Sequence, residues 1–149
     1  VYKRQASDLM QYHVSRSISA PIDKVWALLT DSTTYDDWNP AVVSIEGDIE
    51  AGKTISLVSI VNPKRSFNLK VTQMDAPNRM VWSDGMPLGL FRGDRTFELV
   101  QGEGSTTFSM TEQYSGLLAP LITKTIPDMT DSFDQFADGL KAAAQASPS

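Results

Sequence analysis

The 149-residue chain contains no cysteine and a single histidine. The missing cysteine excludes disulfide bonds, thiolate nucleophiles and thiolate metal sites. His13 has no second histidine for a catalytic dyad or a histidine metal cluster, and it falls on the polar side of its predicted strand. The stretch "GEGS" (102–105) precedes a strand rather than a helix, which indicates a hairpin turn and not a phosphate cradle. We therefore predict no metal and no cofactor.

Long hydrophobic runs and clusters of positive charge are missing as well. The longest nearly apolar stretch, "GLLAPLITKTI" (116–126), is far shorter than the roughly 20 residues that cross a bilayer as a helix. The 13 Lys and Arg residues are scattered and outnumbered by 18 Asp and Glu, for a net charge of −5. We therefore expect no nucleic-acid partner and no stable membrane insertion, and we predict a cytoplasmic protein.

What remains is the composition of an ordinary globular protein. Hydrophobic residues make up 41% of the chain and charged residues 21%. No internal repeat, low-complexity tract or linker divides the sequence. These features predict one domain over residues 1–149, with its core within 11–146, and a chain of this size hides about 70% of the surface exposed when unfolded.

The periodicity of apolar residues predicts an α+β order. A strand at 11–19 alternates with a period of two, and two short helical segments follow, the second stopped at Asn39-Pro40. The next strands are predicted at 42–49, 54–61, 66–74, 79–83, 90–100 and 105–114. Short connections favour an antiparallel meander. Apolar spacings of three and four then predict a long C-terminal helix, kinked or broken near Pro127.

Two stretches carry a family resemblance. "ISAPIDKVWALLTDSTTYDDWNP" (18–40) and "FRGDRTFELVQGEGSTTFSMTEQYSGLLAPL" (91–121) resemble the START/polyketide cyclase-like superfamily (SRPBCC), closest to its polyketide cyclase/dehydrase-like bacterial members. The resemblance implies a helix-grip fold, in which a curved antiparallel sheet of about seven strands wraps around a long C-terminal helix, with two short helices after the first strand. Its relatives bind lipids, sterols, polyketides or quinones, and some are enzymes while others are carriers.

Two charged residues interrupt the apolar face of the last predicted hairpin. Arg95 and Glu112 share that face with Phe97, Phe108 and Met110. If the turn is centred between residues 102 and 103, Phe97 faces Phe108 and Arg95 faces Met110. Arg95 and Glu112 are then diagonal neighbours, within reach of each other.

Two interpretations of this pair stay open. Burying a charge is costly unless it is paired, so Arg95 and Glu112 could form an ion pair that only fixes the register of the strands. Alternatively, both lie in the wall of a water-accessible cavity and orient a polar group of a ligand. Arg16 is a third inward charge by the same alternation, and we expect it at a solvated edge position.

The apolar face and its polar exceptions define a candidate ligand-binding set. It comprises Trp38, Phe67, Leu69, Trp82, Phe91, Arg95, Phe97, Phe108, Met110, Glu112 and Tyr114. A buried indole N–H usually requires a partner, so the tryptophans are packing residues or ligand donors. The loop "SDGMPLGLF" (83–91) either covers an apolar site as a lid or packs its leucines into the core.

Two functions follow from this set. The first is binding of a hydrophobic small molecule, such as a lipid, polyketide or sterol, in an internal cavity between sheet and C-terminal helix. The alternative is a metal-independent polyketide cyclase or dehydratase, in which Arg95 polarises a carbonyl, Glu112 is the general base and Tyr114 donates a proton. A co-chaperone-type interaction protein is a third reading. The sequence does not decide between binding protein and enzyme.

Overall fold

The computed structural model describes residues 11–146. The strands are β1 (Gln11–Ile18), β2 (Val42–Glu46), β3 (Thr54–Ser59), β4 (Phe67–Asp75), β5 (Arg79–Met86), β6 (Phe91–Gln101) and β7 (Thr106–Ser115). The helices are α1 (Ile22–Thr30), α2 (Tyr35–Trp38), α3 (Ala119–Ile122) and α4 (Thr130–Gln145), and two 3-10 turns are η2 (Ser32–Thr34) and η3 (Thr123–Thr125).

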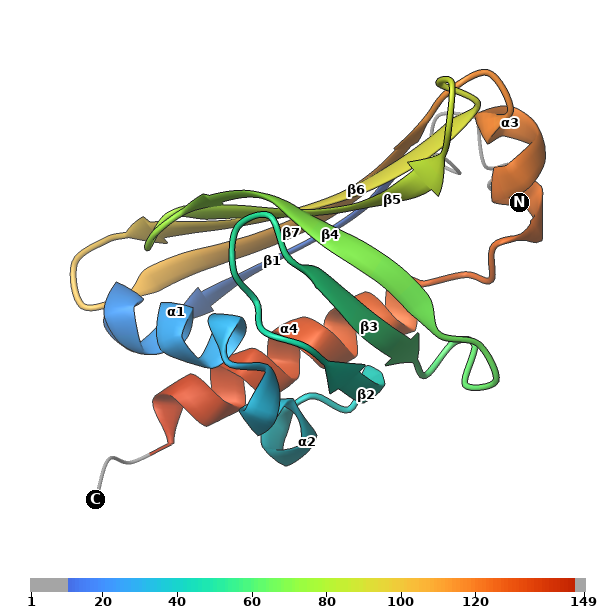
Figure 1. The fold of residues 1–149 in the computed structure, drawn as a ribbon. Coiled ribbons are helices and arrows are strands. Elements are labelled where there is room, and N and C mark those ends of the chain that lie inside the picture. Colours follow the sequence, from blue (N-terminus) through green and yellow to red (C-terminus); the bar gives the residue numbers. More distant parts are fainter. Residues whose placement is uncertain (1–10, 147–149) are drawn as a thin grey trace, which may run out of the picture.

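The seven strands form one antiparallel sheet in the order β1-β7-β6-β5-β4-β3-β2. Strands β2 to β7 are consecutive neighbours, and β1 closes the sheet beside β7. The sheet curls around α4, while α1 and α2 cover the side that it leaves open (Figure 1). This is the expected helix-grip architecture of the α+β class, and the prediction is confirmed.

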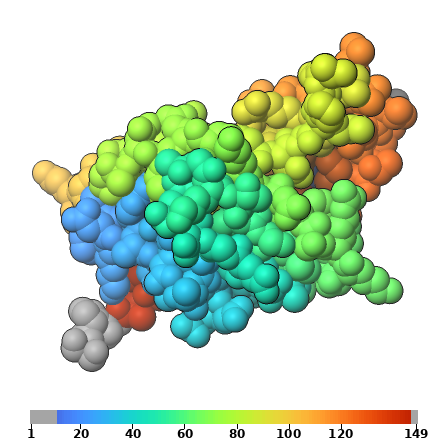
Figure 2. All heavy atoms as spheres, viewed as in Figure 1, coloured from blue at the N-terminus to red at the C-terminus, as the bar shows by residue number. Residues whose placement is uncertain are grey.

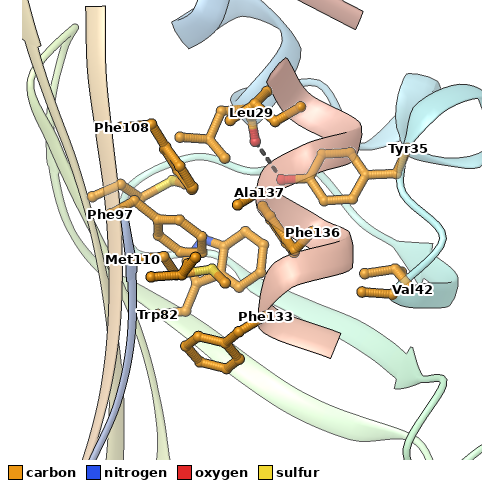
Figure 3. Packing of buried hydrophobic residues seen from close by; sticks show 14 of the residues in the cluster. Leu29, Tyr35, Val42, Trp82, Phe97, Phe108, Met110, Phe133, Phe136 and Ala137 are labelled. Carbon is orange, nitrogen blue, oxygen red and sulfur yellow. Dashed lines mark hydrogen bonds between the residues drawn. The ribbon is translucent and has the colours of Figure 1, made fainter. Parts of the chain in front are cut away.

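The core lies between the middle of the sheet and α4. Phe136 is 1% exposed, and its ring lies 5.9 Å from that of Phe97 and 6.3 Å from that of Phe108. On its other side it meets Tyr35 edge-on (Figure 3), and Trp38 also packs edge-on against it. Because aromatic rings fill this space from both sides, the sheet and the middle of α4 pack without a gap between them.

The C-terminal helix begins later in the chain than its apolar spacing alone would place it. After α3 and η3, the backbone becomes extended at Ile126, ahead of Pro127. The Asp128 carboxylate accepts hydrogen bonds from the backbone N–H and the hydroxyl of Thr130, where α4 starts. The break predicted near Pro127 is therefore present, and the segment 126–129 is non-helical.

Arg16 links β1 to α4 at the edge of the sheet. Its Nε donates to Asp138 at 2.8 Å and its Nη2 to Asp134 at 3.0 Å, both on α4. These carboxylates raise the pKa of Arg16, and the side chain is 27% exposed. Arg16 thus has the half-solvated edge position that the sequence predicts, and its role is structural.

Candidate ligand-binding site

A pocket of about 200 Å³ lies at the end of the sheet where α4 begins. Its walls come from the inner faces of β3 to β7 and from the extended segment before α4. They comprise Leu57, Ser59, Val61, Asn62, Arg65, Phe67, Leu69, Trp82, Asp84, Phe91, Gly93, Arg95, Glu112, Tyr114, Thr125, Ile126, Pro127 and Met129. In Figure 2 the β5–β6 turn and α3 form a lobe separated by a notch from the atoms of β3 and β4.

The inner wall carries the two charges of the β6–β7 hairpin, in a register that differs from the predicted one. Arg95 lies directly opposite Glu112, and Phe97 lies opposite Met110 rather than Phe108. The difference arises in the turn, where Gly104 adopts a positive φ of 68°. The turn is therefore centred one residue later than expected, which moves every cross-strand pair by two positions.

Arg95 and Glu112 form a close ion pair that is mostly shielded from water. Arg95 Nε donates to Glu112 Oε1 at 2.6 Å, and the side chains are 19% and 17% exposed. The guanidinium also lies 4.8 Å from the centre of the Phe133 ring. Among residues 11–146, Nε makes the only side-chain hydrogen bond of Arg95, so its two terminal amino groups are left for a partner in the pocket.

Tyr114 lies next to this pair and is a hydrogen-bond donor. Burial raises the pKa of Tyr114, and both the negative charge of nearby Glu112 and a hydrogen-bonding interaction with its carboxylate raise it further, so the hydroxyl keeps its proton. The hydroxyl lies 3.8 Å from Met129 Sδ, which is a weak acceptor. The ring stacks on that of Phe91, with 5.9 Å between the ring centres.

Trp82 lies opposite Arg95 on the neighbouring strand β5. The side chain is 1% exposed, and its Nε1 has no hydrogen-bond partner in the described part of the chain. Its ring centre is 4.6 Å from that of Phe97, and the two rings lie side by side in Figure 3. Trp82 therefore connects the aromatic core to the wall of the pocket.

Arg65 and Asp84 bring a second pair of opposite charges to the rim. The Arg65 guanidinium lies 4.7 Å from the centre of the Phe67 ring. Partial burial raises the pKa of Asp84, while its hydrogen bond from the Gly85 N–H and the charge of Arg65 act in the opposite direction. Across the whole pocket, two cations and two carboxylates are thus interspersed among apolar walls.

Comparison with known families identifies this architecture. A family model described as "Polyketide cyclase / dehydrase and lipid transport" matches residues 10–145. The chain belongs to this family. A search of curated proteins finds no match.

Solved structures share the fold of this polyketide cyclase/dehydrase family member. A START superfamily protein from Mycobacterium smegmatis has a TM-score of 0.67 at 14% identity, covering 91% of this chain and 97% of its own. Truncated norcoclaurine synthase from Thalictrum flavum has a TM-score of 0.67 at 15% identity, with 93% and 94% covered. A Rhodobacter sphaeroides protein has a TM-score of 0.68 at 19% identity, with 91% of each chain covered. At these identities the similarity shows the fold alone.

The structure divides the candidate residues of this family member into two groups. Phe67, Leu69, Trp82, Phe91, Arg95, Glu112 and Tyr114 lie in the pocket wall. Trp38, Phe97, Phe108 and Met110 lie in the core instead. Phe97 and Phe108 pack against Phe136 of α4, which fills the part of the sheet that they face. Trp38 packs on Tyr35 and donates from Nε1 to Thr34 Oγ1 at 3.3 Å, so it does not cap the pocket mouth.

Several other residues of the pocket wall carry no signal in the sequence. Among them, Arg65 lies in the β3–β4 connection, and Ile126 and Met129 lie in the non-helical segment before α4. No periodicity marks residues in such connections, and only the break at Pro127 indicated that this segment leaves the helix.

The 83–91 stretch does not pack Leu88 into the core, although Asp84 and Phe91 of this stretch lie in the pocket wall. Its first four residues continue β5 as far as Met86, and Leu88 at the turn is 94% exposed with a φ of 63°. The N–H groups of Leu117 and Leu118 donate to the Gly89 and Leu90 carbonyls, which joins the turn to the start of α3.

Residues 11–146 contain neither a membrane-spanning helix nor a metal-binding cluster. No helix there is long and apolar enough to cross a membrane. Three or more His, Cys, Asp or Glu side chains in an arrangement that could hold a metal ion are not found there either.

Proposed function

We propose that this protein binds a small hydrophobic molecule in the pocket between the end of the sheet and the start of α4. One observation carries the proposal: the inner face of the sheet packs tightly against α4, yet beyond Phe133 it encloses about 200 Å³ of space. Binding sites for small molecules commonly combine apolar walls with a few placed polar groups. Here Leu57, Leu69 and Phe91 supply the apolar surface, while Arg95 and Glu112 supply the polar contacts.

The volume limits what the pocket holds without expansion. Pockets for drug-sized ligands typically have a volume of about 300–1,000 Å³, whereas a cavity of about 150 Å³ is enough to hold benzene. The pocket therefore suits a ligand, or the end of a ligand, of about one aromatic ring. A complete sterol would require the segment 125–129 or the β3–β4 connection to move outward.

A pair of matched variants tests this proposal. Val61→Trp adds a bulky side chain to the pocket wall, while Val100→Trp makes the same change at a residue that is 63% exposed and outside the wall. Titration with α-methylstyrene, followed by the NMR signal of the Trp82 indole N–H, should show saturable binding to the wild type and Val100→Trp. Val61→Trp should bind at least tenfold more weakly. Equal binding by both variants would place the ligand elsewhere and refute the proposal.

The side chains assembled around Glu112 favour a second candidate, a metal-independent dehydratase or cyclase. Glu112 would take a proton from the carbon next to a carbonyl, Tyr114 would protonate the departing hydroxyl as water, and Arg95 would stabilise the enolate oxygen. The ion pair opposes this role, because Glu112 must give up its contact with Arg95 when it takes the proton.

The enzyme hypothesis is tested with 4-hydroxy-4-phenylbutan-2-one. Its dehydration gives a conjugated enone that is followed by ultraviolet absorbance. Turnover by the wild type that falls at least a hundredfold in Glu112→Gln supports an enzyme. A rate no higher than that of Glu112→Gln rejects dehydration of this substrate and leaves the binding proposal intact.

A further inference from the structure

The charges around the pocket are balanced in a way that restricts the charge of a ligand. Arg95 makes its ion pair with Glu112 at 2.6 Å. At the rim, partial burial raises the pKa of the Asp84 carboxyl, and the charge of Arg65 opposes that rise. The wall thus holds two cations and two carboxylates, and the cation at its inner end, Arg95, already has a carboxylate partner, so an incoming anion would meet no uncompensated positive charge there.

Hydrogen-bond donors are nevertheless left over at the inner end. Arg95 uses Nε for Glu112, and its terminal amino groups make no hydrogen bond within residues 11–146. The Tyr114 hydroxyl lies 3.8 Å from the Met129 thioether, a weak acceptor, and it also interacts as a donor with the Glu112 carboxylate. Both side chains line the pocket, and a ligand oxygen there gains the terminal amino groups of Arg95 as donors without displacing any hydrogen bond that they make.

We infer that the ligand presents an uncharged carbonyl oxygen to Arg95 and Tyr114, and that an aromatic carbonyl compound of about one ring is the class that this pocket selects. The inference deepens the proposed function and rests on it. A carbonyl accepts the free donors and adds no charge. A carboxylate in the same place would lie beside Glu112, whose repulsion offsets the attraction of Arg95, and the carboxylate would still lose its hydration. A hydrocarbon would leave the donors without an acceptor.

Three probes of nearly the same planar shape separate these cases. Acetophenone carries a carbonyl, α-methylstyrene replaces the carbonyl oxygen by a CH₂ group, and benzoate replaces the methyl group by a charged oxygen. Each is titrated into the full chain, with the Arg95 Nε–H and Trp82 indole N–H signals followed by NMR. We expect acetophenone to bind about tenfold more tightly than either of the others, as for one hydrogen bond to a charged donor.

Removing the charge of Glu112 should abolish the preference for an uncharged ligand over an anion. Glu112→Gln keeps the shape of the side chain and an oxygen that can accept from Arg95 Nε, but it leaves the guanidinium uncompensated. Benzoate should then bind at least tenfold more tightly than it does to the wild type, whereas the affinity for acetophenone should change less than threefold. Glu98→Gln is the matched control, because Glu98 pairs with Arg79 at 3.3 Å on the exposed face of the sheet. It should change neither affinity.

The outcomes distinguish failure of this inference from failure of the proposed function. If α-methylstyrene binds as tightly as acetophenone, the pocket accepts hydrophobic ligands but the selection for a carbonyl is refuted. Tightest binding of benzoate by the wild type refutes the charge argument. If none of the three probes binds, the proposed function fails, and the inference fails with it.

Discussion

The Arg95–Glu112 pair should contribute to stability in a way that a double-mutant cycle can measure. Breaking a buried ion pair by removing one partner costs about 3–5 kcal/mol, and breaking an exposed pair about 0.2–1 kcal/mol. At 19% and 17% exposure this pair lies nearer to the buried case. We therefore expect Arg95→Met to lower the free energy of unfolding by about 2–3 kcal/mol. Glu112→Gln should cost about 1–2 kcal/mol, because the amide oxygen still accepts from Nε.

The double variant Arg95→Met/Glu112→Gln contains no unpaired charge. We expect it to cost less than the sum of the single changes, with a coupling energy of about 1–2 kcal/mol. Urea unfolding at pH 7, followed by tryptophan fluorescence, measures all four proteins. For a chain of this length, 1 kcal/mol corresponds to about 2–4 °C in Tm, so Arg95→Met should also unfold about 5–10 °C lower in a thermal scan.

A second Arg–Glu pair supplies the control for this cycle. Arg79 and Glu98 also face each other across neighbouring strands, but they are 41% and 53% exposed. Arg79→Met and Glu98→Gln should each cost less than about 1 kcal/mol and show a coupling below about 0.5 kcal/mol. The reasoning is refuted if the two cycles give the same coupling, because Arg95 and Glu112 would then be solvated like the exposed pair.

Two further predictions concern the core. Burial raises the pKa values of Tyr35 and Tyr114 above their ordinary value near 10, so above pH 10 the unfolded chain loses these protons while the folded chain keeps them. Between pH 10 and 11 the free energy of unfolding should therefore fall by about 1 kcal/mol for each tyrosine, and Tyr114→Phe should remove its share of this loss in urea unfolding over that range; an unchanged pH dependence would contradict this. Gly139→Ala should destabilise the protein by about 1–3 kcal/mol in the same assay, although alanine is favoured in helices by about 1 kcal/mol, because the added Cβ would clash with the Trp38 carbonyl oxygen. A gain in stability would show that α4 can move away from α2.

The sequence predicts which face of the sheet a side chain lies on better than it predicts which residues pair across neighbouring strands. Alternation alone places Phe97, Arg95 and Glu112 on the inner side of the sheet, since a period of two is a property of the extended backbone. The sequence does not predict that Arg95 pairs directly with Glu112, because this pairing depends on which residue of the turn adopts the left-handed conformation. Gly102 and Gly104 are equally able to do so, and only the folded chain shows that it is Gly104.

The sequence also does not predict at which end of the sheet the pocket lies. Phe97 and Phe91 look alike as inward-facing aromatic residues of the same strand, yet one lies in the core and the other in the pocket wall. What separates them is how far α4 extends across the sheet. That is a distance between elements distant in sequence, and no local pattern encodes it.

The lengths of α4 and β6 explain why a pocket exists at this end of the molecule. With 16 residues, α4 is about 24 Å long, whereas β6 with 11 residues extends about 36 Å. Figure 1 shows β5 and β6 running on past the N-terminal end of α4 towards α3. Over this remainder the inner face of the sheet is covered by the extended segment around Pro127, which offers fewer side chains than a helix would.

The polar pair lies at the boundary between these two regions. On one side, Phe133 in the first turn of α4 contacts the Arg95 guanidinium; on the other, Phe91 and Tyr114 face the open volume. One additional helical turn before Thr130 would add about 5.4 Å to α4 and bring its side chains over Arg95 and Glu112. A solid core there would have to bury both charges completely, at high cost in desolvation. The late start of α4 at Thr130 therefore accounts both for the space and for the presence of an arginine and a glutamate on an otherwise apolar face.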